Sequence, residues 1–520
     1  MEKLGIRSVF RIWAILGLLA MIVIWFLPWR FQTNDDELMM WLVSGAYTGT
    51  PESYAVFIHP LLSWIFSKLY TLFPEIRWYP LTWFLVMYLG YLSLLKVLFQ
   101  SKHQSSSNMV LATILLGLLI HFALFMQFTV VAGFAGLAGF ALIIPYTQKQ
   151  KFAQSLLIFT LLFISILIRW ESFVLVGLGF FAYLIFFNSR ILRTRVFFLF
   201  SILLLFLIGF FAKTFWENSS SYSDFVCYNQ ARAAVSDHPV TFRYLAEEKI
   251  NLDSKWFYFS QWMMDEDEIG ISELEERRKK LDAEMFTFLQ VKSSFLRLYH
   301  VVRAEAFKSV FSIIMIIYFF FSGYDLKKKV FFFVFWVSFF LVFNHFFILN
   351  GRVIVLFVFP FFVASIASSF NLLAKFAIPI SIFLLGLISI HLWNFEEEAR
   401  GRAIMRDEFL SIQCDIPINS LLIIEGYKEN YLGIHFSQKK PVPFISFGWI
   451  SKSPFQKEAL TRLGLSSILE TEDFYLFGVD VQEEFFFEGY MNFRSTEKYI
   501  LQEKIKSRNW FRFHFEKSLP

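Results

Sequence analysis

Apolar runs of about 20 residues, separated by short charged clusters, limit what this chain can fold into more than any other feature. Hydrophobic residues make up 56% of its 520 residues, and its mean hydropathy is +0.53. A soluble protein of this length cannot bury so much apolar surface in one core. Lipid removes that conflict, provided that each segment satisfies its own backbone hydrogen bonds, as a helix does. The sequence therefore predicts an all-α polytopic membrane protein.

The apolar runs divide into about eleven transmembrane helices when each is given roughly 20 residues. The first run follows Lys3, Arg7 and Arg11 and has no small-residue cleavage site after it, so we interpret it as a retained signal anchor. Residues 1–394 are therefore expected to form a transmembrane domain. The predicted spans begin near Val9, Trp78, Met109, Phe128, Phe152, Ser172, Val196, Ala304, Val330, Val353 and Phe376.

Basic residues are distributed unequally between the two sides of these spans, and this bias predicts the orientation. With the N-terminus in the cytoplasm, the short turns on the opposite side hold only Arg30, Arg169 and Arg352. We therefore expect a multi-pass protein of the bacterial inner (cytoplasmic) membrane. The cytoplasmic turns would contain Lys96, Lys102, Lys149, Lys151, Arg190, Arg193, Arg195, Lys327, Lys328, Lys329 and Lys375.

Two large loops are expected outside the cytoplasm. The first, residues 30–77, contains an apolar stretch at 58–73 that is short for a span and has Ser or Thr at every fourth position on one face. We interpret this stretch as a helix on the membrane surface. The second loop, residues 214–303, contains a charge-rich stretch at 272–280, which suits a solvated helix. Its acidic run at 265–268 is also expected to be solvated.

Residues 395–520 are expected to form a small extracytoplasmic α/β domain after the last span. Short runs rich in β-branched and aromatic residues alternate there with turn residues, which is typical of strands. The expected strands are 420–424, 444–447, 467–469 and 474–479, with a helix at 454–463.

An acidic cluster, Asn34-Asp35-Asp36-Glu37, begins the first outer loop. Asn34 or Asp35 could cap a helix, and the acids after the cap would be favoured by the helix dipole. Alternatively the cluster is catalytic, since three adjacent carboxyl groups raise one another's pKa. The residues alone leave both interpretations open.

The segment Asp36-Glu37-x-x-Met40-x-x-x-Ser44 resembles the Asp-Glu-x-x-Tyr-x-x-x-Ala pattern of the glycosyltransferase-C superfamily. Protein O-mannosyltransferases and lipid A aminoarabinose transferases are members of it. In those enzymes the acidic pair opens the first loop outside the cytoplasm, and a soluble domain follows many spans. The present chain departs from the pattern at Met40 and Ser44, and Asp35 adds a third acid.

The resemblance implies transfer of a sugar from a polyprenyl-phosphate carrier to an acceptor hydroxyl of a glycan, a lipid or a protein. A general base must then take the hydroxyl proton. The resemblance gives this role to Asp36, with Asp35 as its main rival. Glu37 would orient the acceptor or share a divalent cation, Mg²⁺ or Mn²⁺, with Asp36, although no sequence pattern requires a metal.

Cations at the outer ends of the spans are candidates for binding the carrier phosphate and its growing negative charge. Arg352 and Arg169 come first, because a guanidinium group matches a phosphate in bidentate fashion. Lys213 and His59 are further candidates, and Arg232 in the second loop could approach the site. The alternative for each of these side chains is that it only reaches toward the lipid headgroups.

Two other functions are compatible with many spans. An O-antigen polymerase or ligase has a large outer loop but would depend on loop arginines and not on an acidic cluster. A non-enzymatic transporter of lipid-linked glycans would show paired halves and charges at the membrane midplane. The basic residues form no patch interleaved with aromatic residues, so no nucleic acid partner is expected.

Overall fold

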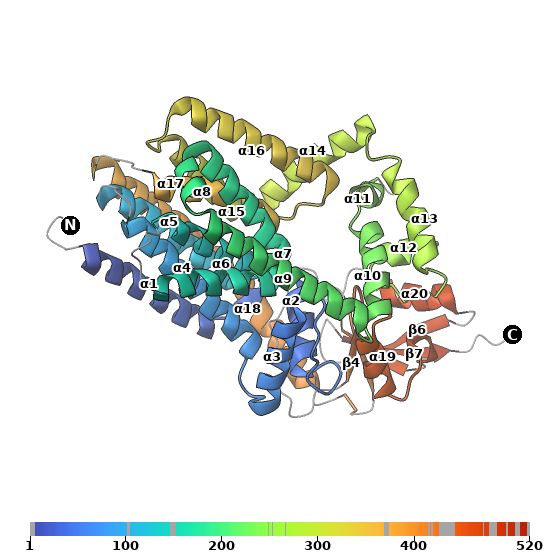
Figure 1. Cartoon of the computed structure of the whole chain (residues 1–520). Coiled ribbons are helices and arrows are strands. Elements are labelled where there is room, and N and C mark those ends of the chain that lie inside the picture. The colour runs from blue at the N-terminus through green and yellow to red at the C-terminus, as the bar shows by residue number, and fades with distance from the viewer. Residues whose placement is uncertain are drawn as a thin grey trace.

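The computed structural model describes residues 6–100, 105–145, 152–247, 249–251, 253–265, 267–368, 374–413, 416–417, 420–425, 443–471, 473–477, 486–495, 498–504 and 510–516. A bundle of apolar helices makes up the larger part of the molecule (Figure 1). A sheet with short helices lies at the end of the bundle remote from the N-terminus (Figure 1).

Within the described residues, seven helices are long and apolar enough to cross a membrane, and three shorter apolar helices accompany them. They lie where the sequence predicts spans, with the spans predicted from Phe152 and Ser172 joined in one helix. The chain is therefore a multi-pass membrane protein, while the count of about eleven spans stays a prediction. The seven are α1 (Ile6–Phe26), α4 (Trp78–Gln100), α5 (Ser105–Leu124), α7 (Phe152–Phe187), α9 (Val196–Ser219), α16 (Leu326–Phe346) and α18 (Ala374–Gln413), and the three are α6 (Phe128–Ile143), α15 (Ala306–Phe320) and α17 (Gly351–Ala367).

Helix α7 is two helices joined at Arg169, whose backbone is not helical (φ −159°, ψ 99°). Both halves lie beside α6. A Cβ added at Gly139 would lie 2.7 Å from Leu162 in the first half, and the Phe140 ring lies 5.1 Å from Phe180 in the second half. The chain therefore reverses at Arg169, which is where the sequence predicts a turn between two spans.

The segment after α1 forms two short helices at the end of the bundle that faces the sheet (Figure 1). α2 (Asn34–Ser44) begins at the acidic cluster, and α3 (Pro60–Leu72) covers most of the predicted surface helix. Before α2, strand β1 (Arg30–Phe31) pairs in parallel with β2 (Phe125–Met126), which directly follows α5. This pairing fixes the start of the first loop against the end of the bundle.

The second loop folds into helices with a small core of their own, to which Leu274 and Leu281 contribute. The charge-rich stretch is a helix, as predicted, with an ion pair of 2.6 Å between Glu276 and Lys280. The helices are α10 (Ser223–Ser236), α11 (Pro239–Ala246), α12 (Lys255–Ser260), α13 (Ile271–Asp282) and α14 (Phe288–Ala304), and α8 (Ser189–Thr194) precedes α9.

Five strands form a mixed sheet in the order β4-β3-β5-β7-β6. β3 pairs in parallel with β4 and β5, whereas β7 is antiparallel to β5 and β6. The carboxyl ends of β3 and β4 therefore lie at one edge of the sheet. The elements are β3 (Leu421–Ile424), β4 (Phe444–Ser446), β5 (Asp473–Phe477), β6 (Lys498–Lys504), β7 (Trp510–Glu516), α19 (Pro454–Thr461) and α20 (Phe486–Arg494).

The predicted strands at 420–424, 444–447 and 474–479 lie at β3, β4 and β5, although residues 478–479 lie outside the described residues. The strand predicted at 467–469 is wrong. Ser467 caps a single 3-10 turn, η1 (Ile468–Glu470), by accepting a hydrogen bond from the Leu469 N–H. Helix α18 also continues beyond the boundary predicted at 394, as far as Gln413.

Candidate functional site

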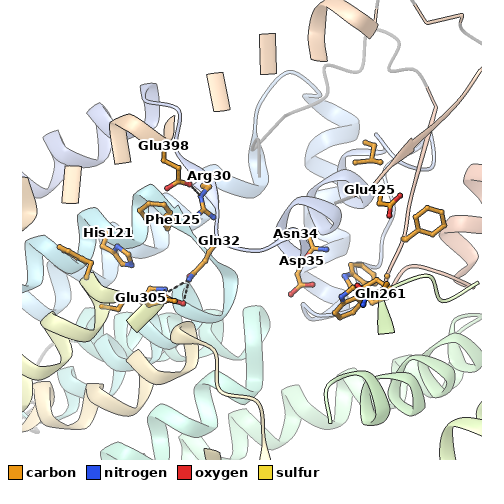
Figure 2. A pocket seen from close by; sticks show the side chains of 18 of the residues that line it. Arg30, Gln32, Asn34, Asp35, His121, Phe125, Gln261, Glu305, Glu398 and Glu425 are labelled. Atoms are coloured by element: carbon orange, nitrogen blue, oxygen red, sulfur yellow. Dashed lines mark hydrogen bonds and ion pairs between the residues drawn. The ribbon is translucent and has the colours of Figure 1, made fainter. Parts of the chain in front are cut away.

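A cavity of about 910 Å³ opens where the bundle, both loops and the sheet edge meet. It is lined by side chains of both signs, by amides and by aromatic rings. In Figure 2 one side of the cavity shows Arg30, Gln32, His121, Glu305 and Glu398, the other side shows Gln261 and Glu425, and Asn34 and Asp35 lie between them.

Helix α2 supplies the acidic cluster to this cavity. Its N-cap, Thr33, has an extended backbone, and the three acids occupy the first helical turn, where the helix dipole favours negative charge. Successive helical residues point about 100° apart, so the acids cannot all face the same way. The Asp35 side chain is 20% exposed and lines the cavity, whereas Asp36 and Glu37 are buried.

Asp36 is held within the protein by two neighbours. The Tyr79 hydroxyl donates to its Oδ1 at 2.9 Å, and the Phe128 N–H donates to both carboxyl oxygens at 3.2 and 3.1 Å. Phe128 is the first residue of α6, so the carboxyl group lies at that helix's positive end. Burial raises the pKa of Asp36 to about 8, and the two donors oppose this rise. Asp36 does not line the cavity whereas Asp35 does, so the geometry favours Asp35 over Asp36 as base.

Asp35 faces a cation from α17. Its Oδ2 lies 3.7 Å from Nη1 of Arg352, whose side chain is 21% exposed. Among the described residues, none accepts a hydrogen bond from this buried Nη1. A guanidinium donor left without an acceptor is costly, and it is suited to receive an anionic oxygen from a ligand.

Arg232 of α10 and Asp237, the C-cap of that helix, extend this cluster. Arg232 is buried, and its guanidinium donates to Asn229 at 2.9 Å. Burial lowers the pKa of Arg232, against the charges of Asp237 and Asp35. The charges of Arg232, Asp35 and Arg352 also act on Asp237. Asp35, Asp237, Arg232 and Arg352 therefore form one cluster of two carboxylates and two guanidinium groups. Arg232 does not line the cavity, and its role stays a prediction.

Other cations at the cavity already have acidic partners. Arg30 Nε lies 2.7 Å from Glu398, which also pairs with Arg402 at 2.5 Å. Lys308 pairs with Glu305, whose carboxylate also accepts from the Gln32 amide at 3.3 Å. Because of these ion pairs, the bundle side of the cavity is polar but has a net charge near zero.

Arg169 does not line the cavity. It pairs with Glu171 at 3.1 Å, and its guanidinium carbon lies 5.5 and 5.2 Å from the ring centres of Phe57 and Phe128. Its contact with Phe128 places it next to the residue that binds Asp36. Arg169 therefore connects the turn within α7 to the start of α6, which is a structural role.

Lys213 and His59 lie outside the cavity lining as well. Lys213 Nζ is 3.6 Å from Glu217 and donates to the Val56 carbonyl at 3.3 Å. His59 Nδ1 caps α3, and its Nε2 lies 3.1 Å from the Gly209 carbonyl. Both side chains tie the first loop to α9, so the geometry favours a structural role for them over phosphate binding.

An apolar groove of about 230 Å³ lies next to the cavity, between α14, α15, α16 and α17. Residues such as Ile313, Ile316, Trp336 and Phe361 line it. Glu305 and Lys308 line both the groove and the cavity. The two spaces are therefore neighbours, one apolar and one polar.

The sequence alone does not predict most of the residues that line the bundle side of the cavity. His121 Nδ1 and His391 Nε2 lie 2.8 Å apart, yet they come from spans 270 residues apart in sequence. No local pattern could pair them. Glu305 and Lys308 did carry a signal, because charged residues at the head of an apolar segment are functional candidates by default.

The divalent cation stays a prediction. Its proposed ligands, Asp36 and Glu37, are both buried, and the Asp36 oxygens accept the hydrogen bonds described above. Within the part of the chain that the structure describes, no group of three or more His, Cys, Asp or Glu side chains is arranged to hold a metal ion.

The chain is similar over most of its length to two solved structures of ArnT from Cupriavidus metallidurans, an aminoarabinose transferase of the glycosyltransferase-C superfamily. The ArnT bound to undecaprenyl phosphate matches with a TM-score of 0.42 and 11% identity, covering 96% of this chain and 97% of that one. The apo structure gives 0.42 and 11% over 97% and 98%. No family model and no curated protein matches the chain. A TM-score this low gives no evidence for the activity, which depends on the contacts within the chain described above.

Proposed function

We propose that this protein is a membrane glycosyltransferase that moves a sugar from a polyprenyl-phosphate carrier to an acceptor hydroxyl, outside the cytoplasm. The observation that carries the proposal is that Asp35 lines a polar cavity, which adjoins an apolar groove, and lies 3.7 Å from Arg352 behind it. Such a reaction needs a base, a cation for the leaving phosphate and a channel for hydrocarbon, and this arrangement provides all three.

The carrier lipid occupies both spaces. Its hydrocarbon chain lies in the groove between α14 and α17, where it is shielded from water. Its phosphate lies at the polar end of that groove, near Lys308 and the first turn of α17. The N-terminus of α17 carries the positive end of the helix dipole, which favours an anion.

Asp35 is the general base. The acceptor hydroxyl attacks the anomeric carbon of the donor sugar, and the hydroxyl proton moves to the Asp35 carboxylate. The bond between the anomeric carbon and the phosphate oxygen breaks, and that oxygen keeps the bonding electrons. Asp35 is supported as base over Asp36 because Asp35 lines the cavity and Asp36 does not.

Arg352 stabilises the leaving phosphate. Its Nη1 has no hydrogen-bond acceptor among the described residues, so it can donate to a phosphate oxygen. The charge on that oxygen grows as the glycosidic bond breaks, and a cation fixed in advance stabilises this charge. The nearby Asp35 carboxylate keeps the guanidinium oriented before the donor binds.

Binding of undecaprenyl phosphate to the purified full-length protein in nanodiscs tests the donor site by native mass spectrometry. Ser312 lines the groove, and we expect Ser312→Trp to fill it and weaken binding about tenfold or more. Ile317 lies on the same helix, outside the groove and 51% exposed, so Ile317→Trp is the matched control and should bind normally. Equal binding by the two variants would remove the groove from the proposal.

A further inference from the structure

Three elements form the cavity wall opposite the bundle: the loop after α12, the loop after β4, and the end of β3. The loop after α12 contributes Gln261 and Trp262, and the loop after β4 contributes Trp449. The end of β3 contributes Glu425. In Figure 2, Gln261 and Glu425 lie on the side of Asn34 and Asp35 that is remote from His121. We call Gln261, Trp262, Trp449 and Glu425 the tryptophan wall. The donor site described above does not use it.

Trp262 has a strained backbone and an exposed ring. Its φ is +69°, in the left-handed region that bulky residues rarely adopt. Its side chain is 46% exposed although it lines the cavity. The ring lies over Gly448, where an added Cβ would be 3.5 Å from Trp262 Cε3, and Arg232 lies 5.9 Å from the ring centre. Strain combined with exposure adds no stability, and it is typical of a residue that contacts a ligand.

Trp449 presents an unused donor. The side chain is 3% exposed, and among the described residues none accepts a hydrogen bond from its Nε1. A buried N–H without an acceptor costs about 1–3 kcal/mol. The indole lines the cavity, so a ligand oxygen there would satisfy this donor.

Glu425 lies at the carboxyl end of β3. Its Oε1 accepts from the Phe486 N–H at 2.6 Å, and its Oε2 accepts from the Phe487 N–H at 3.1 Å. These bonds fix the carboxylate at the N-terminus of α20. Each carboxylate oxygen can accept more than one hydrogen bond, so Glu425 still has capacity to accept from a hydroxyl.

The two tryptophan loops are tied to each other by Asp265. Its Oδ2 accepts from the Ser451 hydroxyl at 3.3 Å and from the Gln456 amide at 3.2 Å. The prediction of a solvated acidic run is therefore wrong for Asp265, and burial raises its pKa to about 6. Because Asp265 follows Trp262 by three residues and Ser451 follows Trp449 by two, the tie sets the spacing of both rings before any ligand binds.

We propose that the tryptophan wall is a saccharide-binding subsite, which presents a sugar hydroxyl to Asp35. The apolar C–H face of a pyranose ring stacks on the exposed Trp262 indole. Its oxygens accept from Trp449 Nε1 and from the Gln261 amide, and one of its hydroxyls donates to Glu425. A few polar groups around an aromatic surface are what fixes the orientation of such a ligand. This inference rests on the proposed transferase function and adds that a carbohydrate, not a polypeptide, reacts at the site.

The saccharide belongs to the acceptor, and the experiment has separate arms for the acceptor and for the donor sugar. Binding is measured on the full-length protein in nanodiscs. The acceptor arm uses a panel of soluble bacterial oligosaccharides. The donor arm compares glycosyl-phospho-undecaprenols with undecaprenyl phosphate that carries no sugar. A third arm uses peptides containing Ser and Thr.

Three variants and one control separate the contributions. We expect Trp262→Ala to weaken saccharide binding about tenfold, because it removes the stacking surface. Trp262→Phe should retain most of the binding, and Trp449→Phe, which loses only the N–H, should weaken it several-fold. Trp64 is 49% exposed on α3 outside the cavity, so Trp64→Ala should bind normally. Thermal unfolding of each variant confirms that it is folded.

A loss confined to oligosaccharides assigns the wall to the acceptor, and a loss confined to the glycosylated lipids assigns it to the donor sugar. The first result supports the proposal, and the second overturns it. Equal saccharide binding by Trp262→Ala and the unchanged protein overturns it, and so does binding of peptides alone. Binding of undecaprenyl phosphate without a sugar should be the same in all variants. If the unchanged protein does not bind undecaprenyl phosphate, that result overturns the proposed transferase function and not the subsite alone.

Discussion

At the scale of single residues, Asp35 and Asp36 are adjacent in the chain but have different surroundings. Asp35 reaches the cavity and lies 3.7 Å from Arg352, while Asp36 is fully buried between Tyr79 and Phe128. The sequence predicts that the cluster matters but cannot choose between the two acids. The choice depends on Tyr79 of α4 and Phe128 of α6, which bind the Asp36 carboxyl group and lie far from it in sequence.

Asp36 is expected to make stability depend on pH. Burial raises its pKa from 3.8 to about 8, so between these values the native protein holds a proton that the unfolded chain releases. The contribution of Asp36 to the free energy of unfolding should therefore be fully present below about pH 4 and be lost as the pH rises toward 8. Asp36→Asn removes the titration, and its midpoint of thermal unfolding should vary less with pH over this range.

Parallel pH profiles for the unchanged protein and Asp36→Asn would mean that the Tyr79 and Phe128 donors outweigh burial and keep Asp36 ionised.

At the scale of elements, α2 is the helix whose position decides the site. It ends at Gly45, which has φ +78° and whose N–H donates to the Leu42 carbonyl at 3.0 Å. A Cβ at Gly45 would lie 2.6 Å from the Thr50 carbonyl carbon and 2.7 Å from the Pro51 nitrogen. Because these are backbone atoms, no side-chain rotation relieves the contact.

Gly45→Ala should therefore destabilise the protein more than backbone strain alone explains. Gly464 is the matched control, because its φ is +74° and no atom lies within 4 Å of an added Cβ. We expect Gly464→Ala to cost about 1 kcal/mol, the cost of the left-handed region, and Gly45→Ala to cost at least twice as much. Thermal unfolding of both variants measures this difference. Equal shifts of the unfolding midpoint would contradict the prediction, because they would mean that the first loop shifts to relieve the contact at Gly45.

Element prediction succeeded where one pattern dominates. Apolar runs such as residues 128–143 and 196–219 are helices because nothing else satisfies their backbone in lipid. It failed at residues 467–469, where Ser467 supplies a local cap that composition does not reveal. Strands β6 and β7 were missed as well, because their pairing partners lie elsewhere in the chain.

At the scale of the whole molecule, the site exists only when distant segments meet. The cavity combines Asp35 from the first loop, Lys308 from α15, His391 from α18 and Trp449 from the sheet edge. The sequence predicts the loops, the terminal α/β region and the acidic cluster, because each is encoded locally. The lining of the cavity is set by tertiary packing, which a single sequence without repeats does not show.

The transferase account depends most on Asp35 acting as the base. The direct measurement is the rate of sugar transfer from a polyprenyl-phosphate donor by the purified protein, with Asp35→Asn and Asp36→Asn compared at equal folded concentration. Removing a general base costs roughly 10²-fold to 10⁴-fold, so Asp35→Asn should lower kcat by at least about 100-fold. Asp36→Asn should stay within about tenfold of the unchanged protein, because its carboxyl group binds Tyr79 and Phe128 and not substrate. Full activity in Asp35→Asn, with activity lost in Asp36→Asn, would contradict the account.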